Sequence, residues 1–206
     1  MCSACIVEQD GPRCSCGVKA LATWSGALAG VLLIVIGGLL PVASLWPDGT
    51  LSVVDLPATW QVPSLLLCAL VCGPRAGMLA AVAYLSLGLL DLPVFTAGGG
   101  LSYVLEPGFG YLAGFIPAAW LTGRLSQQQG MGEVEAQTTA AAAGLVTLQF
   151  CGLLNIALGS LLGRWDETFL RLVMDYSLGP LPTQLALCAA TGVLAVVMRW
   201  LLLIRE

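Results

Sequence analysis

Uncharged, mostly apolar stretches recur along the chain, and they predict its membrane-crossing segments. A helix needs about 20 residues to cross a hydrocarbon core of about 30 Å, and a charged side chain near its centre costs roughly 2.5–3.5 kcal/mol. The stretches without Asp, Glu, Lys or Arg are 20–47, 56–74, 76–90, 107–123, 136–163 and 176–198. The first, fifth and sixth are long enough to span a bilayer, whereas the second to fourth are short and must tilt or share their ends with flanking charges. We therefore expect an all-α membrane protein with six transmembrane helices, the second and third joined by a tight turn at Gly73, Pro74 and Arg75.

A glycine-rich stretch, residues 92–105, is uncharged but is not predicted to be a helix. It contains Pro93 and the triplet Gly98-Gly99-Gly100, which break helices and permit irregular backbone. Irregular backbone at membrane depth is tolerated only where it is buried in protein or lines a cavity. Two interpretations stay open for this loop between the third and fourth helices: a lid or wall of a binding site, or a plain loop at the membrane surface.

The amino-acid composition excludes several classes to which the protein could belong. Hydrophobic residues make up 58% of the 206 residues, charged residues make up 10%, and the mean hydropathy is +0.90. These values exclude a water-soluble globule and a disordered chain, because soluble domains carry about 25% charged residues. The net charge of −4 leaves no basic surface for nucleic acid.

The inventory of reactive groups argues against an enzyme. The sequence has no histidine, which removes the usual acid–base catalysis and histidine metal ligation. No ionisable residue lies near the middle of a predicted helix, which disfavours an ion-coupled transporter. A Walker A motif is also absent from the sequence. We expect a membrane protein that binds a ligand, with no cofactor and no metal.

The distribution of Lys and Arg predicts the orientation, because cytoplasmic loops carry an excess of these residues. With the N-terminus in the cytoplasm, only Arg164 and Arg171 fall outside. The residues that then fall inside are Arg13, Lys19, Arg75, Arg124, Arg199 and Arg205. This arrangement predicts a multi-pass protein of the cell membrane with both termini in the cytoplasm and the glycine-rich loop outside.

The N-terminal tail, residues 1–19, is distinguished by four cysteines, and residues 20–206 form the predicted substrate-binding domain. Four thiols can hold a zinc ion or an iron–sulfur cluster, but the spacing of Cys2, Cys5, Cys14 and Cys16 fits no standard finger. We favour a reduced cytoplasmic tail without metal. The later cysteines are expected to pack as small apolar side chains.

Polar side chains gather at the predicted outer ends of several helices. A single Gln or Asn in a helix bundle often bonds a neighbouring helix, worth about 1 kcal/mol. Several such groups beneath one glycine-rich loop instead favour a pocket for a small molecule. The polar residues in question are Thr59, Gln61, Tyr103, Glu106, Tyr111, Gln149, Asn155 and Gln184.

An ordered series of motifs occupies residues 56–124. The first is Pro57-x-Thr59-x-Gln61, followed by Gly73-Pro74-Arg75-x-Gly77. Tyr84, the run from Gly88 to Phe95 and the glycine triplet come next, and the segment from Glu106 to Phe115 ends the series. Together these motifs resemble the BioY family, in which the last segment commonly reads G-P-T-G-G-Y-L-x-G-F.

The resemblance implies a six-helix subunit that binds biotin in an outward-facing pocket closed by loops. It also implies partners: a transmembrane coupling subunit and two ATPase subunits of an energy-coupling factor transporter. Aromatic side chains are expected to stack on the bicyclic ring, and Gln61, Asn155 and Gln184 to supply hydrogen bonds. The full set of expected ligand-binding residues is Thr59, Gln61, Tyr84, Phe95, Gly99, Tyr103, Tyr111, Asn155 and Gln184.

The partner interface is expected on the first helix, where Ala22, Gly26 and Gly30 share one face and permit close approach of another helix. The same row can equally pack against the protein's own helices.

The sequence departs from the family at the last helix. The family commonly has P-G-D-x-x-K there, whereas this chain has Gln184 in place of the acid and Leu187 in place of the lysine. A ligand carboxylate then needs another partner: a helix N-terminus, amides of the glycine-rich loop, or Arg164 and Arg171. The alternatives are that the same fold binds a different vitamin-like molecule, or that the chain is a bundle protein outside transport.

Overall fold

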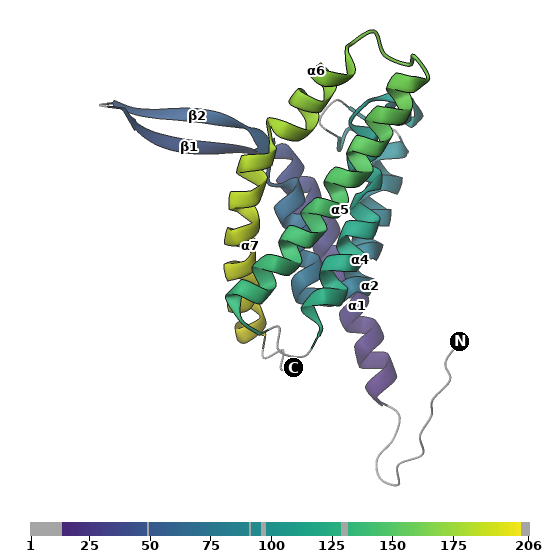
Figure 1. Ribbon diagram of the computed structural model, residues 1–206. Coiled ribbons are helices and arrows are strands. Elements are labelled where there is room, and N and C mark those ends of the chain that lie inside the picture. The colour runs from purple at the N-terminus through teal and green to yellow at the C-terminus, as the bar shows by residue number, and fades with distance from the viewer. Residues whose placement is uncertain (1–13, 49, 91, 96–97, 129–131, 203–206) are drawn as a thin grey trace.

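The computed structural model describes residues 14–48, 50–90, 92–95, 98–128 and 132–202 as a helical bundle with one projecting hairpin (Figure 1). Cys2 and Cys5 of the cysteine-containing tail lie outside the described residues, and the first helix begins at Cys14, five residues before the expected domain boundary. The long helices are α1 (Cys14–Leu39), α2 (Gln61–Leu89), α4 (Phe115–Ser126), α5 (Val134–Leu161) and α7 (Leu181–Leu201). The short elements are β1 (Pro41–Asp48), β2 (Thr50–Thr59), the 3₁₀ helix η1 (Leu101–Leu105), α3 (Phe109–Ala113), α6 (Phe169–Val173) and the π-helical turn η2 (Met174–Leu178).

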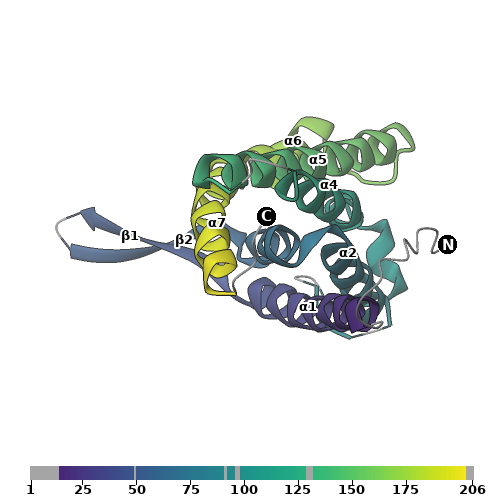
Figure 2. The same cartoon turned by 90° about the horizontal axis from the view of Figure 1, so that it is seen from below.

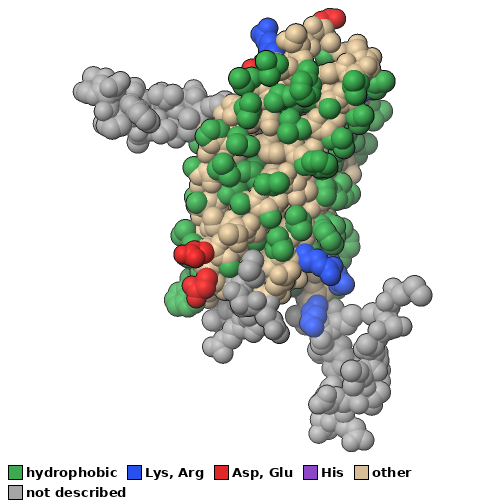
Figure 3. Space-filling view, viewed as in Figure 1, with side chains coloured by type: hydrophobic (Ala, Val, Ile, Leu, Met, Phe, Trp, Pro, Cys, Tyr) green, Lys and Arg blue, Asp and Glu red, His purple; other side chains and the backbone are tan. Residues whose placement is uncertain are grey.

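Within the described residues, four helical segments are long and apolar enough to cross a membrane. They are Lys19–Leu39, Gln61–Leu89, Val134–Leu161 and Phe169–Leu201. Large apolar side chains cover the outside of the bundle (Figure 3), including Trp24 on α1 and Phe150 on α5, each 66% exposed. A soluble monomer rarely exposes so much contiguous apolar surface. The chain is therefore a membrane protein.

The segment assigned as α2 reverses its direction at Gly73. Nε2 of Gln61, at its start, lies 2.8 Å from the hydroxyl of Tyr84, near its end. In a straight helix these residues would stand about 34 Å apart at 1.5 Å per residue. Gly73 adopts φ 87° and is followed by Pro74, a combination that ends one helix and begins another. The turn predicted at this position is where the two antiparallel halves, 61–72 and 74–89, meet.

A β-hairpin corrects the all-α expectation at residues 41–59. The first uncharged stretch was expected to be helical as far as residue 47, but α1 ends at Leu39 and β1 begins at Pro41. Strand β1 pairs antiparallel with β2, and Asp48 opposes Thr50 at the tip. Pro41 cannot continue a helix because its ring fixes φ and removes the backbone donor. The hairpin projects sideways from one end of the bundle (Figure 1).

Glycines let the helices approach closely, and they decide what α1 packs against. A Cβ on Gly26 would lie 2.9 Å from Cβ of Cys72, and one on Gly30 would lie 2.9 Å from Cβ of Ala80. Both glycines are buried against α2, whereas Ala22 is exposed. In this structure the chain's own α2 covers the side of α1 that carries Gly26 and Gly30 (Figure 2), which is the second of the two interpretations given for this row.

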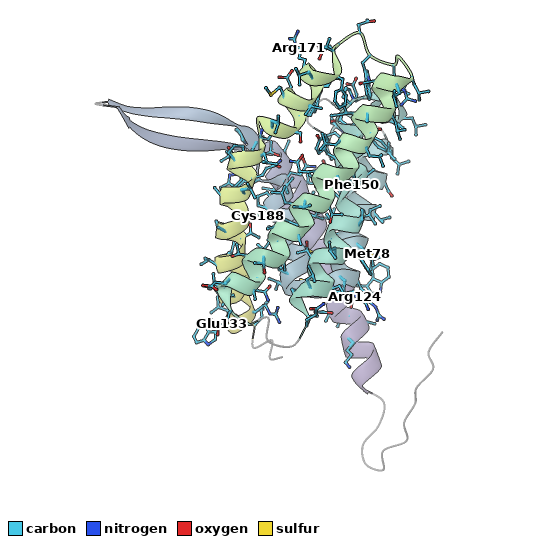
Figure 4. All side chains as sticks on the ribbon, in the orientation of Figure 1. Met78, Arg124, Glu133, Phe150, Arg171 and Cys188 are labelled. Carbon is cyan, nitrogen blue, oxygen red and sulfur yellow. The ribbon has the colours of Figure 1, made fainter. Side chains whose placement is uncertain are left out.

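Charged side chains of the described residues gather at the two ends of the bundle (Figure 3). Arg124 and Glu133 lie at the end where α4 stops and α5 starts, and Arg171 lies at the opposite end (Figure 4). At the Arg124 end, Nη1 of Arg199 donates to the carbonyl of Ser126 over 2.9 Å. The hairpin and the glycine-rich stretch both belong to the Arg171 end, which we call the hairpin end.

Candidate functional site

An open cavity of about 390 Å³ lies at the hairpin end of the bundle. The base of the hairpin, the start of α2, α3, the start of α4, η2 and the start of α7 all contribute to it. This volume suits a small organic molecule. The lining residues are Pro41, Ala58, Thr59, Gln61, Val62, Tyr103, Gly108, Tyr111, Leu112, Phe115, Leu148, Tyr176, Pro180 and Gln184.

The residues expected from the sequence divide into two groups. Those that line the cavity are Thr59, Gln61, Tyr103, Tyr111 and Gln184. The other expected residues lie outside the lining, where they hold parts of the wall in place: Tyr84, Phe95, Gly99 and Asn155. The second group fixes the positions of several residues of the first.

Tyr84 fixes the position of Gln61. Its side chain is fully buried, and its hydroxyl accepts a hydrogen bond from Nε2 of Gln61 over 2.8 Å. The same hydroxyl donates to the carbonyl of Val94 over 2.9 Å. Gln61 is held by this chain of bonds with its Oε1 still able to accept a hydrogen bond.

Tyr84→Phe is expected to lower stability because it removes both bonds and leaves a donor of Gln61 and the Val94 carbonyl without their partner. Such losses cost about 1–3 kcal/mol, which corresponds to about 2–10 °C in melting temperature for a chain of this size. Thermal unfolding of the detergent-solubilised protein measures the shift. Tyr176→Phe is the matched control, because Tyr176 is 39% exposed and should leave the melting temperature within about 2 °C. Equal effects of the two variants would contradict this role of Tyr84.

The glycine-rich stretch packs on the end of α2 and delivers Tyr103 to the cavity. Gly100 donates its amide hydrogen to the carbonyl of Gly88 over 2.8 Å. The ring of Phe95 lies 5.4 Å from that of Tyr84 and 4.7 Å from that of Tyr103, measured between centroids. A Cβ on Gly99 would collide with the backbone of Leu92. Of the two interpretations, the described part of the stretch fits a supporting wall.

Asn155 is bonded to backbone and lies outside the cavity lining. Its Nδ2 donates to the carbonyl of Pro107 over 3.1 Å. Gly110 packs directly against its side chain. Asn155 thus ties α5 to the start of α3 and places Gly108 at the cavity.

A second polar chain orients Gln184. Oγ of Ser177 donates to Oε1 of Gln149 over 2.7 Å, and Nε2 of Gln149 donates to Oε1 of Gln184 over 3.0 Å. With its oxygen engaged, Gln184 keeps its NH₂ group as a donor. Among the described residues, the cavity therefore presents the Gln184 donor and the Gln61 acceptor on different helices.

Tyr111 adds a further polar group to the cavity wall, beside the apolar Leu112 and Phe115. Its ring packs against Gly152 of α5, where a Cβ would collide with it. Its hydroxyl is buried beside the side chain of Ser177. A hydroxyl both donates and accepts hydrogen bonds, so this group can also contact a polar ligand atom.

The sequence did not identify most of the apolar wall, and it did not give the role of Gln149, which orients Gln184. Phe115 and Leu148 line the cavity, but in the sequence they are indistinguishable from core residues. Gln149 stood out only as an amide in an apolar helix. Gly108 was noted only as part of the segment from Glu106 to Phe115 that resembles the family, and Tyr176 was not singled out, although it lies between Asp175 and Ser177.

The family model described as "BioY family" matches residues 19–203 of the chain. The "Biotin transporter BioY" of Rhodobacter capsulatus is 32% identical over 141 residues, which is 68% of each chain. The "Probable biotin transporter BioY" of Lysinibacillus sphaericus is 46% identical over 68 residues, 33% of this chain and 35% of the relative. The chain spans about a third to a half of the length of the first three curated relatives, at 35%, 46% and 53%.

A solved structure has the same fold. It is described as the crystal structure at 2.1 Å of the S-component for biotin from an ECF-type ABC transporter. The TM-score is 0.65 at 21% sequence identity, and the match covers 92% of this chain and 95% of the solved one.

Proposed function

The chain belongs to the BioY family, and we propose on that premise that it is a membrane subunit that binds biotin for uptake. The family is a transporter family and not a class of enzymes. The relatives named as biotin transporters and the fold of the S-component for biotin support this ligand.

The observation that carries the proposal is the pairing of Gln61 and Gln184 across one cavity. Biotin's ureido group has a carbonyl that accepts hydrogen bonds and N–H groups that donate them. The NH₂ group of Gln184 complements the carbonyl, and Oε1 of Gln61 complements an N–H group. Phe115 and Leu148 provide apolar surface for the rest of the bicyclic ring. Thr59 and Tyr111 remain for further polar contacts.

We propose six membrane segments, with both termini in the cytoplasm and the cavity facing outward. The two halves of α2 and the continuous run of α3 and α4 supply the segments beyond α1, α5 and the run from α6 to α7. The positive-inside tendency supports this orientation. The described cations at the end opposite the hairpin are Lys19, Arg75, Arg124 and Arg199, whereas those at the hairpin end are Arg164 and Arg171. The glycine-rich stretch is then outside.

We propose that the chain associates with a transmembrane coupling subunit and two ATPase subunits, which supply the energy for uptake. The S-component with the same fold comes from an ECF-type ABC transporter. The chain's own sequence contains no Walker A motif. The exposed side of α1, where Ala22 lies, remains available to a partner helix.

Equilibrium binding of radiolabelled biotin to the purified, detergent-solubilised protein tests the proposal. We expect saturable binding of one biotin per chain with nanomolar affinity, displaced by unlabelled biotin but not by thiamine or riboflavin. Uptake of a scarce vitamin needs about −12 kcal/mol of binding free energy. Absence of saturable binding by protein that still unfolds cooperatively would refute biotin as the ligand.

A different vitamin-like ligand is the second candidate, because Leu187 stands where the family commonly has a lysine. Leu187 is 8% exposed and lies outside the cavity lining. Saturable binding of radiolabelled thiamine or riboflavin that unlabelled biotin does not reduce would favour this candidate.

A further inference from the structure

We propose that the cavity recognises the ring of biotin and leaves its acid end in water, so that biotin amides are also ligands. The class includes biotin joined to the side-chain amine of lysine. This inference rests on the proposed function.

The positive charges of the described residues lie away from the cavity lining. None of the cavity-lining residues among those described is Lys or Arg. Lys19, Arg75, Arg124 and Arg199 belong to the opposite end of the bundle, at the start of α1, the turn of α2, and the ends of α4 and α7. Outside the described residues, the only cations in the sequence are Arg13 and Arg205. They adjoin the start of α1 and the end of α7 in the sequence.

The two described cations at the hairpin end are directed to other partners or to water. Arg171 is paired with Asp175 at 3.8 Å, and its side chain is 69% exposed. Arg164 is exposed and also lies outside the cavity lining. A carboxylate carried into the cavity would therefore meet no cation there. Burial of an unpaired carboxylate is strongly unfavourable, so the acid end is expected to stay at the mouth.

Carboxylates adjoin the part of the cavity lined by Tyr103 and Tyr176, which we call the mouth. Glu106 donates its amide hydrogen to the carbonyl of Tyr103 over 3.0 Å, and Asp175 directly precedes Tyr176 in η2. Glu106 is exposed in the connection between η1 and α3. Glu106 repels a ligand carboxylate and attracts a positively charged tail, whereas Arg171, 3.8 Å away, offsets the charge of Asp175. Conversion of the acid into an amide removes the repulsion and leaves the ureido contacts of Gln61 and Gln184 unchanged.

Competition against radiolabelled biotin on the full-length protein tests the inference. The competitors are biotin, biotinamide, biotinyl-lysine and the monoamide of biotin with ethylenediamine, whose tail is cationic. We expect biotinamide and biotinyl-lysine to compete within about threefold of biotin, and the cationic amide to bind about three times more tightly at low salt. That preference should vanish at about 0.5 M salt, where exposed charges are screened. If biotin binds and both neutral-tailed amides bind 30-fold or more weakly, the protein reads the carboxylate and the inference is wrong.

A pair of variants separates the mouth charge from general effects. Glu106→Gln should reduce the preference for the cationic amide by about twofold to threefold and leave binding of biotinamide unchanged. Glu133→Gln, at the opposite end of the bundle, should change neither. Equal effects of the two variants would refute the role of the mouth. Failure of every compound to bind, biotin included, would instead refute the proposed function and this inference with it.

Discussion

Replacement of Gly108 by phenylalanine is expected to reduce biotin binding more than 100-fold while the protein remains folded. Gly108 lines the cavity and has φ −68° and ψ −18°, a conformation open to any L-residue. The nearest atoms to a Cβ at this position belong to the ring of Tyr176, at 3.4 Å, and to the hydroxyl of Tyr103, at 3.9 Å. Both neighbours line the cavity, so a phenyl ring added here projects into the space that the ligand needs.

Gly108→Ala is the matched control for this variant. Its methyl group makes ordinary van der Waals contact with Tyr176, and binding should stay within about threefold of wild type. Both variants should unfold within a few degrees of wild type, measured by thermal unfolding in detergent. Wild-type affinity in Gly108→Phe would show that the ligand does not occupy this cavity.

Gly123→Ala is expected to destabilise the protein by about 1–3 kcal/mol, the usual cost of overpacking. An added Cβ would lie 2.6 Å from Cα of Pro74 and 2.9 Å from the carbonyl carbon of Gly73. These atoms belong to the turn that reverses α2, where Pro74 and the positive φ of Gly73 leave the backbone little freedom. Helix α4 must therefore move away from the turn.

The corresponding fall in melting temperature is about 2–10 °C. Thermal unfolding of Gly123→Ala beside Gly108→Ala measures it, because both changes add one methyl group but only the first meets backbone. If the two variants melt together with the wild type, α4 does not approach the turn as the structure has it.

The reversal of α2 could be predicted from the sequence, whereas the hairpin could not. Gly73 followed by Pro74 between two apolar stretches has a single local explanation, a break in the helix. Residues 41–47 carry no charge, and the absence of charge is compatible with either a helix or a strand. Pro41 could have predicted the end of the first helix, because proline lacks a backbone donor, but it does not predict a strand.

The polar ends of the helices predicted where the cavity lies, but not the task of each residue. Gln61 and Gln184 line the cavity, whereas Asn155, an amide of the same chemistry, bonds the carbonyl of Pro107. A sequence gives the hydrogen-bonding groups of a side chain but not which neighbour satisfies them. The same holds for Gly26 and Gly30, whose close-packing face is occupied by the chain's own α2.

A crystal structure of the protein with biotin bound tests the central claim most directly. The claim predicts biotin in the cavity, with its ureido oxygen about 2.7–3.2 Å from Nε2 of Gln184 and a ureido N–H at the same distance from Oε1 of Gln61. The carboxylate should lie toward Tyr176, outside contact with Lys or Arg. Biotin bound elsewhere, or with its carboxylate buried between the two glutamines, would contradict the account.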